Sequence, residues 1–103
     1  MKKKNLRALE KVYWVYILLC DNNSYYTGYT DNLEKRYDAH ITGKSRCKYT
    51  RSFKPLKIAQ SWQVSDKAFA MKLERSIKKL TRNEKEKLIH NPQLIDEVCD
   101  VIK

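Results

Sequence analysis

Two tyrosines stand at a spacing that suits chemistry on a pair of adjacent strands. Tyr16 lies within Trp-Val-Tyr, and Tyr26 begins Tyr-Thr-Gly ten residues later. Paired strands can place two phenols side by side on one face of a sheet. Taken singly, each tyrosine fits a core residue with a satisfied hydroxyl more often than a catalytic one. Taken together, they are candidates for acid–base work.

One arginine and one histidine follow at helical spacing. Arg36 and His40 are four residues apart, so they lie on one face of a helix, beside its apolar stripe. This position predicts side chains at the edge of the core, where an active-site floor would lie. The alternative is a solvated arginine beside a surface histidine. A single histidine without a second His or Cys nearby is a poor transition-metal site.

Glu74 is the only acidic residue between Lys67 and Asn83. It neighbours the apolar Leu73, so its carboxylate is expected at the border of a buried stripe. It could simply pair with Lys78, an interaction worth about 0.2–0.5 kcal/mol. The functional alternative is a ligand for Mg²⁺, an ion often held by one or two protein carboxylates plus phosphate and water.

A basic segment, residues 43–54, is expected to form a loop, and its first part, residues 43–51, carries four cations, hydroxyls and one aromatic side chain. Charge combined with stacking suits single-stranded or distorted nucleic acid. An ordinary solvated loop is the alternative. The residues expected to bind nucleic acid here are Lys44, Arg46, Lys48, Tyr49, Thr50 and Arg51.

The net charge supports a polyanionic partner. The chain has 103 residues and a net charge of +10, and residues 35–87 alone contribute +11. Basic surfaces of this kind attract nucleic acid. No apolar run is long enough for a membrane span, and three cysteines without a C-x-x-C pair argue against disulfides and structural zinc. We therefore expect a cytoplasmic protein with reduced thiols, with a monomer favoured over an oligomer.

The pattern of apolar residues predicts the elements that hold these side chains. A strand buried on both faces, a four-residue turn and a second strand form a hairpin, where Gly28 indicates close backbone approach or a bulge. The order β-β-α-β-α-α-α predicts an α+β fold with a small, mostly antiparallel three-stranded sheet flanked by helices. The expected strands are 12–20, 25–29 and 56–64, and the expected helices are 31–42, one from about 67 to 80, 82–91 and 92–102.

Local signals predict where the helices begin and end. Asp31 and Glu34 form a capping-box pattern, as do Thr81 and Glu84. Gly43 can close the first helix, and either Ser65 or Asp66 can begin the long one. Asn91-Pro92 is typical of an N-cap followed by proline at the first helical position.

Trp14-Val15-Tyr16 and Tyr26-Thr27-Gly28 resemble the two motifs that name the GIY-YIG endonuclease superfamily. Arg36 and His40 fall where that family has its helix arginine and a following His or Tyr, and Glu74 matches its metal-binding glutamate. Lys48-Tyr49-Thr50-Arg51 resembles a loop of the small stand-alone bacterial, UPF0213-like branch. The departure is Trp-Val in place of Gly-Ile, and the tyrosine is retained. The resemblance covers roughly residues 12–90.

The resemblance implies an endonuclease that hydrolyses phosphodiester bonds in DNA, possibly branched, nicked or single-stranded, with one Mg²⁺ or Mn²⁺ ion. Tyr16 would be the general base, and Tyr26 would orient the water or the phosphate. Arg36 would neutralise developing charge, and His40 would hold a phosphate or relay a proton. Glu74 would place the metal.

Two other functions stay open at this point. The runner-up is a DNA- or RNA-binding module that does not cleave, and a basic protein that docks on an acidic partner is least favoured. The expected organisation is a basic leader at 1–11, the nuclease domain at 12–90 and a C-terminal helix at 91–103.

Overall fold

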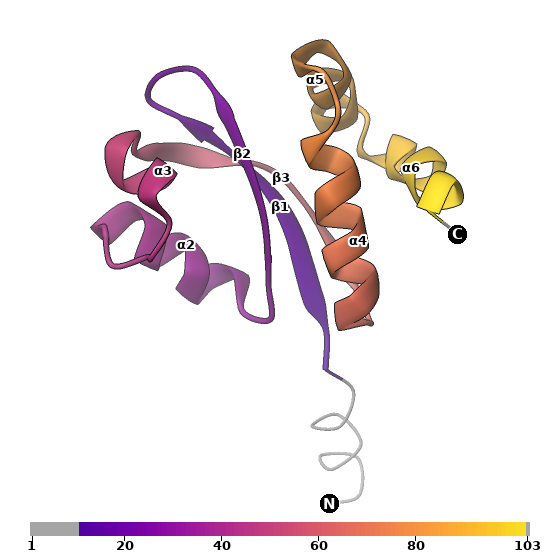
Figure 1. The fold of residues 1–103 in the computed structure, drawn as a ribbon, viewed down its shortest axis with the longest axis horizontal. Helices are drawn as coiled ribbons and strands as arrows, with labels where there is room; N and C mark the ends of the chain where they lie inside the picture. Colours follow the sequence, from indigo (N-terminus) through magenta and orange to yellow (C-terminus); the bar gives the residue numbers. More distant parts are fainter. Residues whose placement is uncertain (1–10, 103) are drawn as a thin grey trace, which may run out of the picture.

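A three-stranded antiparallel sheet in the order β2-β1-β3 lies between two groups of helices (Figure 1). The structure is a computed structural model and describes residues 11–102. The elements are β1 (Tyr13–Cys20), β2 (Tyr25–Thr30), α2 (Leu33–Thr42), α3 (Lys48–Ser52), β3 (Pro55–Val64), α4 (Lys67–Lys78), α5 (Arg82–His90), the 3₁₀ turn η1 (Pro92–Leu94) and α6 (Ile95–Ile102). The helices α2 and α3 lie on one side of β2, and α4, α5 and α6 lie on the other. The predicted α+β class and mostly antiparallel sheet are confirmed.

The central strand β1 is buried on both faces, as its unbroken apolar run predicts. Val15, Tyr16, Ile17 and Leu18 are all at most 2% exposed. Val15 and Ile17 join a core cluster with residues of α4 and α5, namely Ala70, Leu73, Ile77 and Leu88. Side chains on one face of β1 therefore pack toward α4, and side chains on its other face pack toward α2.

The N-cap of α2 lies one residue later than expected, and the helix covers Leu33–Thr42. Asn32 is its N-cap and accepts a hydrogen bond from the Lys35 backbone N–H at 3.1 Å, so the prediction of Asp31 as N-cap is wrong. The Asp31 carboxylate instead pairs with Lys11 Nζ at 3.4 Å. Gly43 ends the helix in the left-handed region, with φ of 78°, as predicted.

The basic segment is not wholly a loop. Residues Lys48–Ser52 form the one-turn helix α3, which corrects the expectation of a loop from 43 to 54. Thr50 is fully buried at its centre and anchors it to α2. A helix of five residues is too short to show an apolar period in the sequence.

The later helices begin at the predicted signals, with one exception. Asp66 accepts from the Phe69 N–H, and Thr81 and Glu84 form the complete capping box. The predicted helix from residue 92 is instead η1 followed by α6. The Asn91 side chain makes no capping hydrogen bond there, and its amide nitrogen donates to the Lys87 carbonyl at 3.3 Å.

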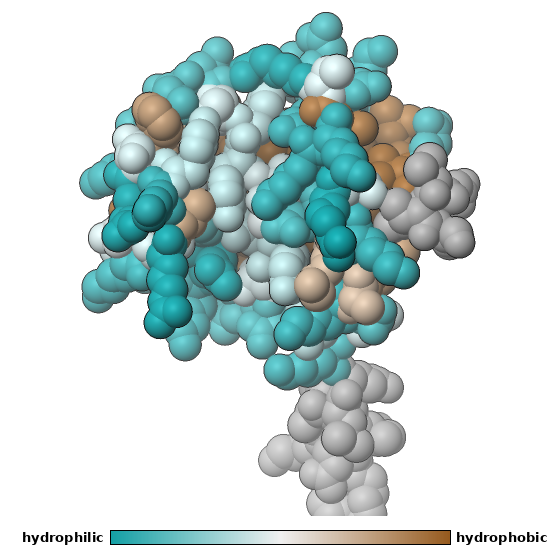
Figure 2. All heavy atoms as spheres, in the orientation of Figure 1, coloured by the Kyte–Doolittle hydropathy of each residue, from teal (hydrophilic) through white to brown (hydrophobic). Residues whose placement is uncertain are grey.

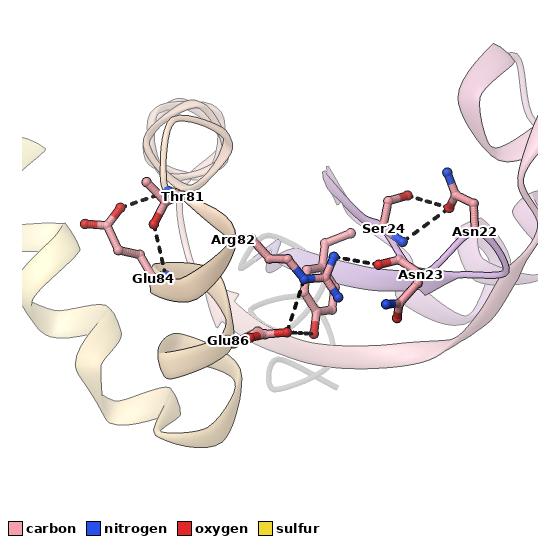
Figure 3. A network of polar contacts seen from close by, with 8 residues as sticks. Asn22, Asn23, Ser24, Thr81, Arg82, Glu84 and Glu86 are labelled. Carbon is pink, nitrogen blue, oxygen red and sulfur yellow. Dashed lines mark hydrogen bonds and ion pairs between the residues drawn. The ribbon is translucent and has the colours of Figure 1, made fainter.

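Arg82 ties the β1–β2 turn to α5 (Figure 3). Its guanidinium donates to the Asn23 carbonyl at 2.5 Å, pairs with Glu86 at 3.3 Å and lies 4.6 Å above the Tyr25 ring. Asn23 has a φ of 67°, a conformation that asparagine tolerates in turns. The end of the hairpin is thereby held against the helices that follow β3.

Among the described residues, no helix combines the length and the apolar character that crossing a membrane requires.

Candidate active site

Tyr16 and Tyr26 lie on one face of the β1–β2 hairpin. Tyr16 is opposite Gly28, and Tyr26 is opposite Leu18, so the two phenols are diagonal neighbours. The pairing of β1 with β2 has no register shift, so Gly28 marks close approach and not a bulge. A β-carbon on Gly28 would lie 2.6 Å from the Tyr16 hydroxyl. The phenol therefore extends across the glycine toward the edge of the sheet.

A chain of buried hydrogen bonds joins Tyr16 to α2 and α3. The Tyr16 hydroxyl lies 3.0 Å from His40 Nε2, and His40 Nδ1 lies 2.8 Å from Thr50 Oγ1. Thr50 in turn donates to the Cys47 carbonyl at 3.4 Å. Because the threonine proton points to a carbonyl, its oxygen accepts from Nδ1–H, and Nε2 is left to accept from Tyr16.

His40 is 1% exposed, and Tyr16 is 2% exposed. The sequence places His40 at the edge of the core, and the structure buries it. Burial, together with the nearby Arg36 charge, lowers the pKa of His40 below its usual range. Burial raises the pKa of Tyr16 well above that of a free phenol, and Arg36 offsets only part of this effect. At neutral pH the pair is a neutral phenol beside a neutral imidazole that can accept its proton.

Tyr26 belongs to a group of aromatic rings around His40. Its ring meets the His40 ring edge-on at 5.4 Å and stacks on Tyr49 at 6.2 Å. Its hydroxyl is hydrogen-bonded to the Cys47 side chain, and burial raises the pKa of Tyr26. Burial also opposes ionisation of the Cys47 thiol, but hydrogen bonds from Tyr26 and Thr50 outweigh it and lower the thiol pKa.

One cavity of about 400 Å³ collects four of the five predicted catalytic residues. Tyr16 and Tyr26 come from the hairpin, Arg36 from α2 and Glu74 from α4. The cavity therefore crosses the edge strand β2 and is walled by helices from both sides of the sheet. Figure 2 shows this face, where a paler strip over β2 lies between strongly hydrophilic surfaces over α2 and α4. The remaining lining residues are Lys11, Tyr13, Gly28, Tyr29, Thr30, Asp31 and Lys67.

A family model of the GIY-YIG catalytic domain matches residues 12–87. The chain belongs to the GIY-YIG family. Membership places it in a nuclease superfamily, and the predicted resemblance is confirmed.

Among the relatives that this GIY-YIG protein matches over most of their length are UPF0213 proteins. One from Syntrophus aciditrophicus is 43% identical over 81 residues, which are 78% of this chain and 93% of the relative. One from Oceanobacillus iheyensis is 46% identical over 81 residues, 79% of this chain and 93% of the relative. The solution NMR structure of a UPF0213 protein from Bacillus halodurans has a TM-score of 0.50 and 39% identity, covering 77% of this chain and 83% of that one.

GIY-YIG nucleases generally use a divalent metal ion, and the cavity residues fit a hard one. The Glu74 side chain is 16% exposed in the cavity wall and pairs with Lys78 Nζ at 3.4 Å. One carboxylate, with room for water and phosphate, is a donor set suited to Mg²⁺ or Mn²⁺. Within residues 11–102, no three His, Cys, Asp or Glu side chains come together in a group that could hold a metal ion.

The residues expected to bind nucleic acid divide into two groups. The four cations are exposed, on α3 and the segment before it. Tyr49 is partly buried, where it stacks on Tyr26 and bonds through its hydroxyl to Asn22 and Ser24. Thr50 is 0% exposed and presents no surface to a nucleic acid, because its hydroxyl faces His40.

Several cavity residues were missed by reasoning from the sequence. Tyr13 and Tyr29 come from the face of the sheet opposite to Tyr16, and they reach the cavity because β2 is an edge strand. Their aromatic character beside the two motifs is the one signal that pointed to them. Lys67 enters from the first turn of α4, and no local pattern marks it.

Proposed function

We propose that this GIY-YIG protein is an endonuclease that hydrolyses phosphodiester bonds in DNA with one bound Mg²⁺ or Mn²⁺ ion. The observation that supports it is the single cavity in which Tyr16, Tyr26, Arg36 and Glu74 meet, with Tyr16 bonded to a buried histidine. Phosphoryl transfer depends chiefly on positioning and charge stabilisation, and these side chains supply both.

Tyr16 and His40 act together as the base. A water oxygen attacks phosphorus and passes its proton to the Tyr16 oxygen, while the Tyr16 proton passes to His40 Nε2, which lies 3.0 Å from that oxygen. Burial disfavours a phenolate, so the histidine removes the need to form one as a lasting state. Because His40 has no access to the cavity, we assign it the relay and not the phosphate-binding role.

The remaining residues of the site stabilise negative charge, hold the metal ion or orient the reactants. Arg36 is exposed on the cavity wall, where its planar fork of donors can bind the non-bridging oxygens as negative charge develops. Glu74 would hold the metal ion, which when bound acts as a Lewis acid toward the phosphate and the leaving 3′ oxygen. Tyr26 orients the attacking water or the scissile phosphate from the neighbouring position on β2.

The test is cleavage of single-stranded, nicked, branched and duplex DNA, and of RNA, with Mg²⁺ or Mn²⁺ and with EDTA. The wild-type chain should cut at least one DNA substrate only when the metal is present. Glu74→Gln should abolish cutting, and Glu97→Gln, an exposed acid on α6, should not. Binding that persists in EDTA, without cleavage under any condition, would contradict the proposal and favour a binding module that does not cut.

A further inference from the structure

A second cavity, of about 440 Å³, adjoins the first one. The two cavities share three lining residues, Thr30, Asp31 and Arg36. The rest of the second cavity comes from the N-cap of α2, from α2 itself and from the segment that follows it, including Lys35, Lys44 and Arg46. A ligand that occupies the first cavity can therefore continue into the second without leaving the surface.

The segment after α2 is held in place by its own hydrogen bonds. Gly43 turns the chain back, and the Lys44 and Ser45 N–H groups both donate to the Ala39 carbonyl, at 3.0 and 3.1 Å. Ser45 is 6% exposed, and its hydroxyl accepts from the Cys47 N–H at 3.0 Å. The loop cations are thus carried on a fixed backbone, which reduces the entropy lost when they bind a ligand.

The charge of the second cavity favours an anion. Its lining has one carboxylate, that of Asp31, which already pairs with Lys11. Against this single negative charge stand four cations: Lys35, Arg36, Lys44 and Arg46. Its lining contains no aromatic ring on which a base could stack. These features suit a backbone phosphate and offer little means to read sequence.

We propose that the second cavity binds the backbone phosphate next to the scissile one, so that the site requires two consecutive phosphodiester linkages in one strand. This inference rests on the proposed function, because it takes the first cavity as the place of the scissile phosphate. Arg36 lines both cavities and contacts both phosphates. Lys44 and Arg46 hold the second phosphate alone.

The experiment is a set of NMR titrations of the ¹⁵N-labelled full chain in EDTA. Dithymidylate without terminal phosphates has one linkage, and trithymidylate has two. The second linkage should tighten binding to the wild-type chain about tenfold, the gain expected for one charge-assisted phosphate contact. It should also add chemical-shift changes at residues 44–46. In the double variant Lys44→Ala/Arg46→Ala, the gain in affinity from the second linkage should fall below about twofold.

A matched control removes a cation elsewhere. Lys87 is exposed on α5, across the sheet from α2 in Figure 1, and Lys87→Ala should keep the full gain. An undiminished gain in the double variant, or an equal loss in Lys87→Ala, would overturn the second subsite.

The outcome separates this inference from the nuclease itself. If the wild-type chain cuts longer DNA but the double variant keeps the tenfold gain, the nuclease stands and the subsite fails. If the double variant loses the gain in affinity but the wild-type chain cuts no substrate with either metal ion, the subsite stands and the nuclease fails.

Discussion

The Tyr16 ring occupies the space that a side chain at position 28 would need. A β-carbon on Gly28 would lie 2.6 Å from the Tyr16 Oη and 2.8 Å from its Cζ. Gly43 is the described glycine with positive φ, so the backbone at Gly28 does not itself demand glycine. The glycine of this motif is required by the tyrosine of the other one, and the two motifs form one structural unit.

Gly28→Ala should therefore displace the Tyr16 hydroxyl from its place beside His40. We expect cleavage to fall at least about tenfold and the free energy of unfolding to fall by about 1–3 kcal/mol, as for other overpacked sites. Initial cleavage rates and urea denaturation measure both. In a Tyr16→Phe background the same alanine should cost no further activity, because both changes act on one hydroxyl. Full additivity of the two losses would contradict this account.

Thr50 should position His40 without contacting the substrate. Thr50→Val keeps the shape but leaves the buried Nδ1–H without an acceptor, at a cost of about 1–3 kcal/mol in the free energy of unfolding. It should also lower the cleavage rate, change the ¹⁵N shifts that report the His40 tautomer and leave the affinity for DNA in EDTA unchanged. Thr50→Ser restores the hydroxyl and should recover the tautomer and most of the rate. A valine variant with the wild-type tautomer would refute this role.

Thr27 differs from Thr50 in the hydrogen bonding of its buried hydroxyl. Its hydroxyl is buried, and it has no hydrogen-bond partner within the described part of the chain. Thr27→Val removes a desolvated polar group at constant shape, so it should raise the free energy of unfolding by about 1 kcal/mol. Chemical denaturation measures the difference, and a loss of stability similar to that of Thr50→Val would show that Thr27 has a partner such as a bound water.

Stability should fall as the pH drops below the pKa that His40 has in the unfolded chain. Its folded-state pKa is lowered, so the unfolded chain binds a proton more readily and the free energy of unfolding decreases as the pH falls below about 6.5. The slope is at most about 1.4 kcal/mol for each pH unit. Tyr16, Tyr26, Thr50 and Arg36 surround the ring, and of these Arg36 further disfavours the charged form.

Urea denaturation between pH 7 and pH 5 should show this slope in the wild-type chain and a smaller one in His40→Gln. Equal slopes in both would mean that other groups control the pH dependence. Cleavage should fall at lower pH than this, through the lowered pKa of His40 in the folded chain, because a protonated imidazole cannot accept the Tyr16 proton.

The sequence predicted most of the architecture and four of the residues that line the first cavity. The apolar run of β1 and the capping box at Thr81 are local signals, so they can be read directly. Asp31 and Asn32 are both good N-caps, and the choice between them depends on tertiary contacts: the Asn32 N–H bonds to Thr30, and the Asp31 carboxylate pairs with Lys11. The burial of His40 depends on α3, which no local pattern reveals.

The division of the basic segment was equally hidden from the sequence. Lys48-Tyr49-Thr50-Arg51 reads as one polar run, yet the turn of α3 exposes Lys48 and Arg51 and buries Thr50 against His40. Which residues of a short helix face inward is settled by its docking partner. The sequence alone therefore grouped Thr50 with the exposed cations, although its buried hydroxyl faces His40.

Tyr16→Phe tests the central claim most directly, because it removes one oxygen atom and leaves the ring in place. On whichever DNA the wild-type chain cuts with Mn²⁺, the variant should cut at least about 100-fold more slowly, with its melting temperature changed by only a few degrees. Tyr37→Phe removes a phenol of α2 outside both cavities and should cut at the wild-type rate. A Tyr16→Phe variant that cuts as fast as the wild-type chain would contradict the account.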